Sequence, residues 1–272
     1  MGDMHIVLKA EALFHIGPIP ITNSFFMMIV VMSLILIVGS IAAKRITEDP
    51  RSAGRFGTAV EFIIGFLLNL TETTGGKKLG RKIFPLVSGL FIFIILANFS
   101  GLLPGVGSIM VGEDHVPLMR PPTADLNMTL AMSTTTFMAV QIFGIRAHGL
   151  GGRLKHMADP PFIFPIEVVS ELSRIISLAA RLFGNVFAGE VLLGVGYAIA
   201  NAVKITVVPI LLPVLFIGLE VLFGTIQALV FALLTLIYIF LAAAGHDDED
   251  EELEHQERAA HAEDGKPALA GD

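Results

Sequence analysis

Long runs of apolar residues dominate the chain and determine the elements that it predicts. Five runs are long enough for helices that cross the roughly 30 Å hydrocarbon core of a bilayer, which takes about 20 residues. We expect these spans at about 24–43, 83–103, 123–145, 162–200 and 205–243. A shorter helix is expected over about 58–70, opened by a capping box at Thr58 and Glu61. At 1.5 Å per residue it reaches only about 20 Å, so it is interfacial or re-entrant, and the fold class is an all-α membrane protein.

The last two apolar runs are nearly twice as long as a spanning helix requires. Each has roughly 39 residues, or about 58 Å if helical. A straight helix of that length must tilt by roughly 60°, beyond the ordinary range, or break. Lys204 is the only charge between the two runs, so the turn is short. We therefore expect the last two helices to form a long, strongly tilted hairpin.

Composition supports the assignment as a membrane protein and distinguishes a polar C-terminal tail from the membrane domain. The 272 residues are 54% hydrophobic and 16% charged, with a mean hydropathy of +0.75, as in polytopic membrane proteins. Much of the net charge of −7 comes from residues 246–272, which are acidic and almost free of large apolar side chains. This predicts a disordered tail after a membrane domain over 1–245. With no cysteine in the chain, disulfide and thiol chemistry are excluded.

Lysine and arginine gather in three connecting segments, 44–55, 77–82 and 146–156. The positive-inside rule places these segments and the acidic tail in the cytoplasm, and the N-terminus outside. Residues 1–23 lack the basic head and cleavage site of a signal peptide. We therefore expect them to belong to the mature protein.

A narrow polar stripe runs along the fourth apolar run. Its members recur every three or four residues and so share one side of a helix: Glu167, Ser170, Arg174, Ser177, Arg181 and Asn185. A charge near the centre of a bilayer costs at least about 2.5 kcal/mol, so the stripe should face a partner or water. For Arg174 and Glu171, near one end of the run, an internal ion pair is as plausible as a functional role. Arg181 lies deeper and has no acid three or four residues away, which favours a functional role with a partner on another chain.

The fifth run contributes two polar residues to one helical face, Glu220 and Gln227. If the last two helices are antiparallel, Glu220 approaches Glu190, which lies about 180° round its helix from Arg181. Two such carboxylates in low dielectric share a proton, which is how a proton relay is built. We favour a relay for this pair, whereas Gln227 and Asn185 are equally well explained as polar glue between helices.

Other candidates carry less weight. Asp125 opens the third span, where helix N-capping accounts for it, and Asn98 is either polar glue or a helix-end partner. The histidines lie outside the predicted spans and form no HExxH pattern, so no metal site is expected. Walker and dinucleotide-binding motifs are absent from the sequence, so we expect no cofactor and no nucleic acid.

Consecutive blocks of the chain resemble subunit a of the rotary F-type ATP synthases, the static half of a proton channel. They are PITNSFF, GTAVEFIIGF, FPLVSGLFIFIILANFSGLLPG, PPTADLN, LSRIISLAARLFGN and IQALVFALLTLIYI. The resemblance implies a non-catalytic subunit of a bacterial inner membrane. It also implies membrane lipids around the chain and three sets of partners: a ring of c subunits, peripheral-stalk b subunits and the other ATP synthase subunits.

The same resemblance implies roles for individual residues. Arg181 would be the essential arginine that faces the carboxylates of the rotating ring and separates two half-channels. The outer half-channel would be lined by Asn185, Glu190, Glu220 and Gln227, with Asp125 near its mouth. Glu167 would lie near the cytoplasmic exit, and a structural role for Arg174 gains weight.

One departure from the family pattern leaves the transported ion open. Many members have a glutamate and a histidine at the positions of Glu190 and Glu220, whereas this chain has two acids, which raises the alternative of sodium coupling. A self-contained secondary transporter is a rival, although such proteins usually carry matching repeats that the two long runs do not show. A purely structural membrane anchor is a third reading. Co-purification with a ring-forming small proteolipid would separate the three.

Overall fold

The computed structural model describes residues 10–48, 54–103, 106, 109–111, 116–157, 162, 164–202 and 208–244. Five long helices make up most of it: α1 (Asn23–Glu48), α2 (Gly54–Ser100), α3 (Leu126–Met157), α4 (Phe164–Ala202) and α5 (Val208–Ala244). All five are long and apolar enough to cross a membrane, which confirms the predicted all-α membrane fold. The predicted tail over 246–272 lies outside the described residues.

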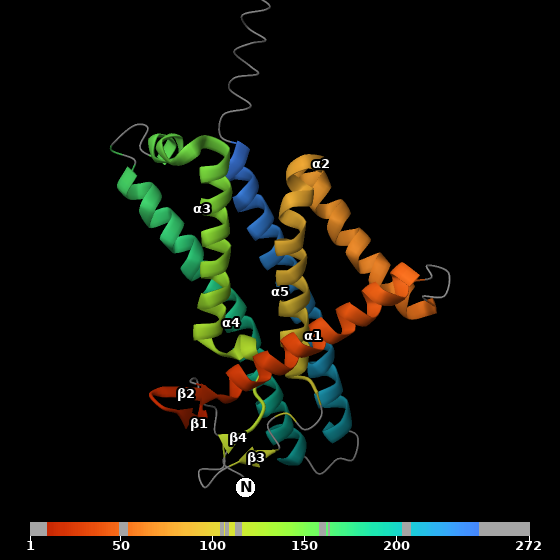
Figure 1. Ribbon diagram of the computed structural model, residues 1–272. Coiled ribbons are helices and arrows are strands. Elements are labelled where there is room, and N and C mark those ends of the chain that lie inside the picture. The colour runs from red at the N-terminus through yellow and green to blue at the C-terminus, as the bar shows by residue number, and fades with distance from the viewer. Residues whose placement is uncertain are drawn as a thin grey trace, which may run out of the picture.

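Helix α2 is two helices joined at a glycine. Gly76 has φ 69° and ψ 162°, a conformation that residues with a Cβ rarely adopt, and it reverses the chain between the halves. Figure 1 shows the two halves of α2 meeting at this bend. A Cβ at Gly80 would overlap the backbone carbonyl of Thr71, so the halves approach closely there. The helix expected over about 58–70 lies within the first half, and its place relative to a membrane stays a prediction.

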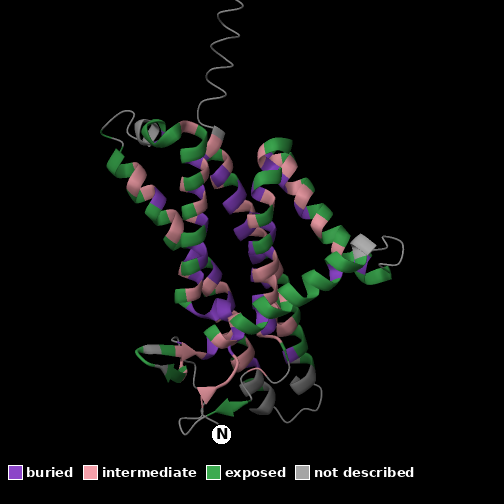
Figure 2. Cartoon of the chain, in the orientation of Figure 1, coloured by how far each residue is buried: buried purple, intermediate pink, exposed green. Residues whose placement is uncertain are grey.

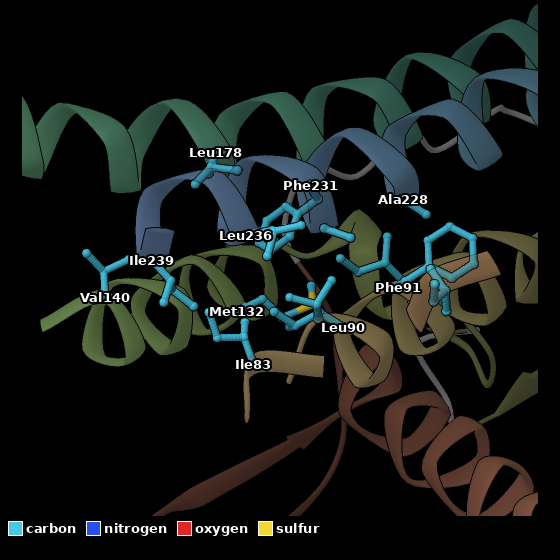
Figure 3. Packing of buried hydrophobic residues seen from close by; sticks show 14 of the residues in the cluster. Ile83, Leu90, Phe91, Met132, Val140, Leu178, Ala228, Phe231, Leu236 and Ile239 are labelled. Atoms are coloured by element: carbon cyan, nitrogen blue, oxygen red, sulfur yellow. The ribbon is translucent and has the colours of Figure 1, made fainter. Parts of the chain in front are cut away.

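Helix α5 lies at the centre of the bundle. It packs against α2, α4 and α3, and α4 also packs along α3. Buried apolar side chains from all four helices form one core, part of which Figure 3 shows: Ile83, Leu90, Phe91, Met132, Val140, Leu178, Ala228, Phe231, Leu236 and Ile239. Inside this core the hydroxyls of Thr136 and Thr235 are 3.2 Å apart and share a hydrogen bond. Helix α1 packs along α2 and exposes most of its length (Figure 2).

Two short antiparallel hairpins, which the hydrophobic pattern did not predict, lie at one end of the bundle (Figure 1). Strands β1 (Ala12–Ile16) and β2 (Ile19–Thr22) precede α1, and strands β3 (Met110–Val111) and β4 (Val116–Pro117) lie between α2 and α3. The buried Asn23 donates its Nδ2 hydrogen to the Pro117 carbonyl at 3.1 Å, which joins the start of α1 to β4. Strand β4 is therefore held against the start of α1.

Helix α3 begins and bends at identifiable residues. The short 3₁₀ helix η1 (Pro122–Ala124) ends at Asp125, whose Oδ1 accepts the Asn127 backbone N–H at 2.9 Å and caps the start of α3. Gly149, with φ 71° and ψ 169°, breaks the helical geometry near the other end. Figure 1 shows the last part of α3 turning away from the bundle axis at this bend.

Helices α4 and α5 have 39 and 37 residues, about twice the length that a bilayer core requires. They run in opposite directions along each other (Figure 1), as a hairpin must. Helix α5 continues through the buried Pro213 near its start. The strong tilt expected from these lengths stays a prediction, because tilt is defined only relative to a membrane.

Candidate functional site

Arg181 lies near the middle of α4 on an exposed face. None of the described residues forms a hydrogen bond or an ion pair with its guanidinium. Within two turns of Arg181, the exposed residues on the same side of the helix are small, namely Ser177, Gly184 and Ala188. Small residues allow the backbone of another helix to come close in a membrane. The surface around Arg181 is therefore exposed, with small side chains on either side of one central positive charge.

Nine residues further along α4, Glu190 meets an arginine from a distant segment. The Nη2 atom of Arg120 is 3.5 Å from Glu190 Oε2, and the two side chains are 9% and 29% exposed. Arg120 lies in the extended stretch before η1, where the backbone hydrogen bonds of the loop and the packing of Pro121 against Gly101 hold it. The sequence reasoning missed this residue. Its only signal was that it is the sole arginine in a loop with an acidic middle.

The carboxyl group of Glu220, on α5, lies against α4 beside Glu190. A Cβ added to Gly189 would be 2.9 Å from Glu220 Oε1, so the glycine makes room for this carboxyl group. The other oxygen, Oε2, is buried without a hydrogen-bond partner among the described residues. Two acids and one arginine, from α4, α5 and the loop before α3, are thus brought to one end of the long hairpin.

A cavity of about 200 Å³ adjoins Glu220 between α4 and α5. Asn185 and Asn98 line it, and each donates a side-chain hydrogen to a carbonyl of α5: Asn185 to Phe223 at 3.2 Å and Asn98 to Gly224 at 3.1 Å. Asn98 Oδ1 is buried and unpaired among the described atoms. A volume of this size with polar groups on its walls can hold several water molecules. Both asparagines therefore bridge helices and also border a space suited to water.

The two remaining candidates at this end of the hairpin are buried. Gln227 is on α5, seven residues from Glu220, and its Nε2 has no hydrogen-bond partner among the described atoms. Asp125 caps α3, as described above, which is the structural explanation considered for it. The structure therefore groups Glu190, Glu220, Asn185 and Asn98, and places Asp125 in the loop that also carries Arg120.

A second polar group lies at the other end of α4, fourteen residues before Arg181. Glu167 Oε1 is 3.8 Å from Arg174 Nη2, and the Arg174 guanidinium lies 5.3 Å from the centre of the Tyr238 ring. Glu171 is buried and pairs with Arg153 at 2.9 Å. Both residues for which an internal ion pair was considered, Arg174 and Glu171, thus form one, with different partners.

Arg181 therefore separates two polar groups along the hairpin. At 1.5 Å per residue, Glu190 lies about 13 Å from it in one direction and Glu167 about 21 Å in the other. Within the described ranges, no group of three or more His, Cys, Asp or Glu side chains could hold a metal ion. The arrangement suits the passage of a small ion or proton from one polar group to the next, because it contains carboxylates, amides and a cavity large enough for water.

These features define an integral membrane protein with ionisable residues inside its helical bundle and with Arg181 exposed, and unpaired among the described residues, on one face of α4. The chain belongs to the ATP synthase A chain family, whose model matches residues 25–240. ATP synthase subunit a of Moorella thermoacetica is 40% identical over 240 residues, which cover 88% of this chain and 99% of that protein. ATP synthase subunit a of Geobacter sulfurreducens is 37% identical over 210 residues, 75% of this chain and 80% of that protein. ATP synthase subunit a 1 of Chlorobium luteolum is 34% identical over 212 residues, 78% of this chain and 85% of that protein.

Proposed function

We propose that this protein is the proton-translocating stator subunit of a rotary ATP synthase. In this proposal it provides two half-channels to a ring of c subunits, and Arg181 separates them. The chain itself makes and breaks no covalent bond other than O–H bonds, and ATP forms on other subunits. The observation that carries the proposal is an unpaired, exposed arginine between two polar groups, in a chain of the ATP synthase A chain family.

The surface around Arg181 supports a partner that moves past it. An arginine stays protonated at physiological pH, so it needs an opposite charge or water nearby. The small residues Ser177, Gly184 and Ala188 let another helix approach closely without locking into deep side-chain packing. A ring carboxylate that passes this face would lose its proton to form a transient pair with the guanidinium. Once past, it could accept a new proton and become neutral.

The proposed path uses the two polar groups as its ends. A proton enters from the outer face past Asp125 and the cavity beside Asn98, moves through Glu190 and Glu220, and neutralises a ring carboxylate near Asn185. Gln227 lines the same side. A neutral carboxyl group can turn through lipid, whereas an ionised one would do so at a cost of at least about 2.5 kcal/mol. After nearly a full turn the ring site releases its proton towards Glu167 and the cytoplasm.

Arg181 gives the path its direction. Because a fixed positive charge lies between the half-channels, a proton cannot cross directly from the Glu190 side to the Glu167 side. Each charge must travel with the ring, and each crossing releases about 2.3 kcal/mol per 100 mV of membrane potential.

In the proposed function the N-terminus lies outside and the C-terminus in the cytoplasm. The chain lies in a bacterial inner membrane, with b subunits and the other ATP synthase subunits as further partners.

The Arg120–Glu190 pair favours the proton over sodium as the transported ion. A sodium ion bound at Glu190 would have to compete with a guanidinium 3.5 Å away, and a second cation in the same place is repelled. A proton carried along the two carboxylates and water meets less of this repulsion, because it can be held as a neutral carboxyl group. Sodium coupling and a self-contained transporter are the alternatives to be tested.

The test is ATP-driven proton pumping in membrane vesicles that contain the complete complex. Arg181→Ala is expected to abolish pumping, because the half-channels would no longer be separated and the ring carboxylate would keep its proton. Arg146→Ala is the matched control, since Arg146 is also an exposed arginine without a described partner, but belongs to α3, which contributes no residue to the proposed path. Normal pumping by assembled complexes with Arg181→Ala would exclude the proposed function.

A further inference from the structure

The Glu167 end of α4 contains a buried ion pair that the proposed path does not use. Arg153 donates a hydrogen bond from Nη2 to Glu171 Oε1 at 2.9 Å, and the two side chains are 10% and 7% exposed. Gln141 donates its Nε2 hydrogen to the other oxygen, Oε2, at 2.6 Å. Both oxygens of the Glu171 carboxylate are therefore engaged by residues of α3.

Two glycines of α3 allow this contact. The bend at Gly149, which has a positive φ of 71°, turns the end of α3 so that Arg153 can point back to the bundle. A Cβ added to Gly144 would be 3.1 Å from Arg153 Nε and 3.3 Å from the Ala242 carbonyl of α5. Gly144 therefore leaves the space through which the Arg153 side chain reaches Glu171. The ion pair therefore depends on the bend in α3 and is not an incidental surface contact.

The pairing next to it is unexpected for a helix. Glu171 precedes Arg174 by three residues, the spacing at which opposite charges on a helix normally pair. Glu167 precedes Arg174 by seven residues, two turns away. Nevertheless the Arg174 guanidinium lies 3.8 Å from Glu167, over the Tyr238 ring, and forms no ion pair with Glu171. Some other interaction must take Glu171 out of reach.

We propose that Arg153 is a positioning residue that neutralises Glu171 and so reserves Arg174 for Glu167. The four charges form two pairs, Arg153 with Glu171 and Arg174 with Glu167, with no net charge. Without Arg153, two acids would compete for one arginine. Glu171, which is closer to Arg174 in sequence and more deeply buried than Glu167, would then draw Arg174 away, because leaving a buried carboxylate unpaired is more costly than leaving a partly exposed one. Glu167 would lose its partner.

This inference rests on the proposed function, in which Glu167 marks the cytoplasmic half-channel. The test is the pH dependence of ATP-driven proton pumping in vesicles with the complete complex, divided by the ATP hydrolysis rate of the uncoupled complex at each pH. Arg153→Leu is expected to move the pH of half-maximal pumping by about one unit, the lower range of what a neighbouring charge does to a carboxylate. Among the described residues, the charged or titratable groups of this cluster are Arg153 from α3, Glu171, Arg174 and Glu167 from α4, and Tyr238 from α5.

The second variant distinguishes positioning from a loss of stability. Arg153→Leu with Glu171→Gln removes the competing carboxylate as well, so the native pH profile should return. A purely structural role for Arg153 would lower the amount of assembled complex and leave the profile per complex unchanged. An unshifted profile in assembled Arg153→Leu complexes, or a shift that persists in the double variant, would overturn the proposal.

Glu171→Gln alone provides a test if Arg153→Leu does not assemble. It removes the competing acid, keeps an oxygen for Arg153 and is expected to preserve the native profile. A shifted profile in this variant would also overturn the inference. Arg181→Ala, measured in the same vesicles, reports on the proposed function separately, because it concerns whether the complex pumps at all and not at which pH.

Discussion

Four arginines of the bundle carry the same charge in different surroundings. Arg120 and Arg153 are buried and paired with Glu190 and Glu171, and the half-buried Arg174 is paired with Glu167. Arg181 alone among these four is exposed and has no partner in the described part of the chain. A buried charge without a partner is strongly unfavourable, so each buried arginine has an acid. An unpaired, exposed arginine on a helix long and apolar enough to cross a membrane needs an opposite charge or water beside it, which agrees with the ring carboxylate of the proposed function.

The Glu190–Glu220 pair leads to a prediction at the residue scale. Glu190→Gln together with Glu220→Gln should lower ATP-driven pumping by at least about tenfold, because neither side chain could then take up and release a proton. The reduction should hold from about pH 6 to 9, because a glutamine amide takes up no proton anywhere in this range. Glu61→Gln, on the exposed first half of α2, is a matched control that should keep native pumping. Pumping by the double variant equal to the native rate across this range would refute the relay.

At the scale of elements, glycines set the positions where helices bend or touch. Gly76 and Gly149 provide positive φ angles at the bends of α2 and α3. Gly80, Gly144 and Gly189 provide close approach: to the backbone of Thr71, to Arg153 and to the Glu220 carboxyl group. The bends and the polar clusters are thus coupled, since two of these contacts involve the charged residues discussed above.

Gly80 provides a test of this packing. Gly80→Ala should destabilise the subunit by about 1–3 kcal/mol, because the added Cβ overlaps the backbone of the first half of α2, which cannot move as a side chain would. Gly89→Ala, in the second half of α2, adds the same atom where nothing lies within 4 Å and should leave stability unchanged. The measurement is the thermal unfolding midpoint of the detergent-solubilised complex, followed through loss of this subunit. Equal midpoints for the two variants would contradict the close contact.

At the scale of the whole molecule, the chain is incomplete without neighbours. Many large apolar side chains are exposed on α1, on the first half of α2 and along the outer faces of α4 and α5. Lipid can cover most of this surface, since apolar side chains are stable in hydrocarbon. Lipid cannot cover Arg181 at the same low cost, so this point of the surface favours a polar partner or water. The identity of the transported ion therefore has to be measured on the assembled complex.

The ion measurement is the prediction at this scale. ATP-driven proton uptake into vesicles should be as fast in sodium-free buffer as in buffer with sodium. The reason is that the Arg120–Glu190 pair disfavours a metal cation on the proposed path. Added sodium should leave the rate unchanged, and a protonophore should collapse the gradient at once. If vesicles acidify only when sodium is present, sodium replaces the proton as the transported ion in the proposed function.

The hydrophobic pattern was enough to predict the five long helices, because each must present about 20 apolar residues to a bilayer whatever its neighbours are. Helical periodicity likewise placed Arg181 on the polar stripe and Glu220 on one face with Gln227, since spacing along one helix is a local property. Only the tertiary structure decided which charges meet. Arg120 comes from a loop and Arg153 from beyond a bend, and the partners of both lie on a different element, α4. Periodicity reports the side of a helix on which a residue lies, whereas pairing across helices depends on how loops and bends direct the chain.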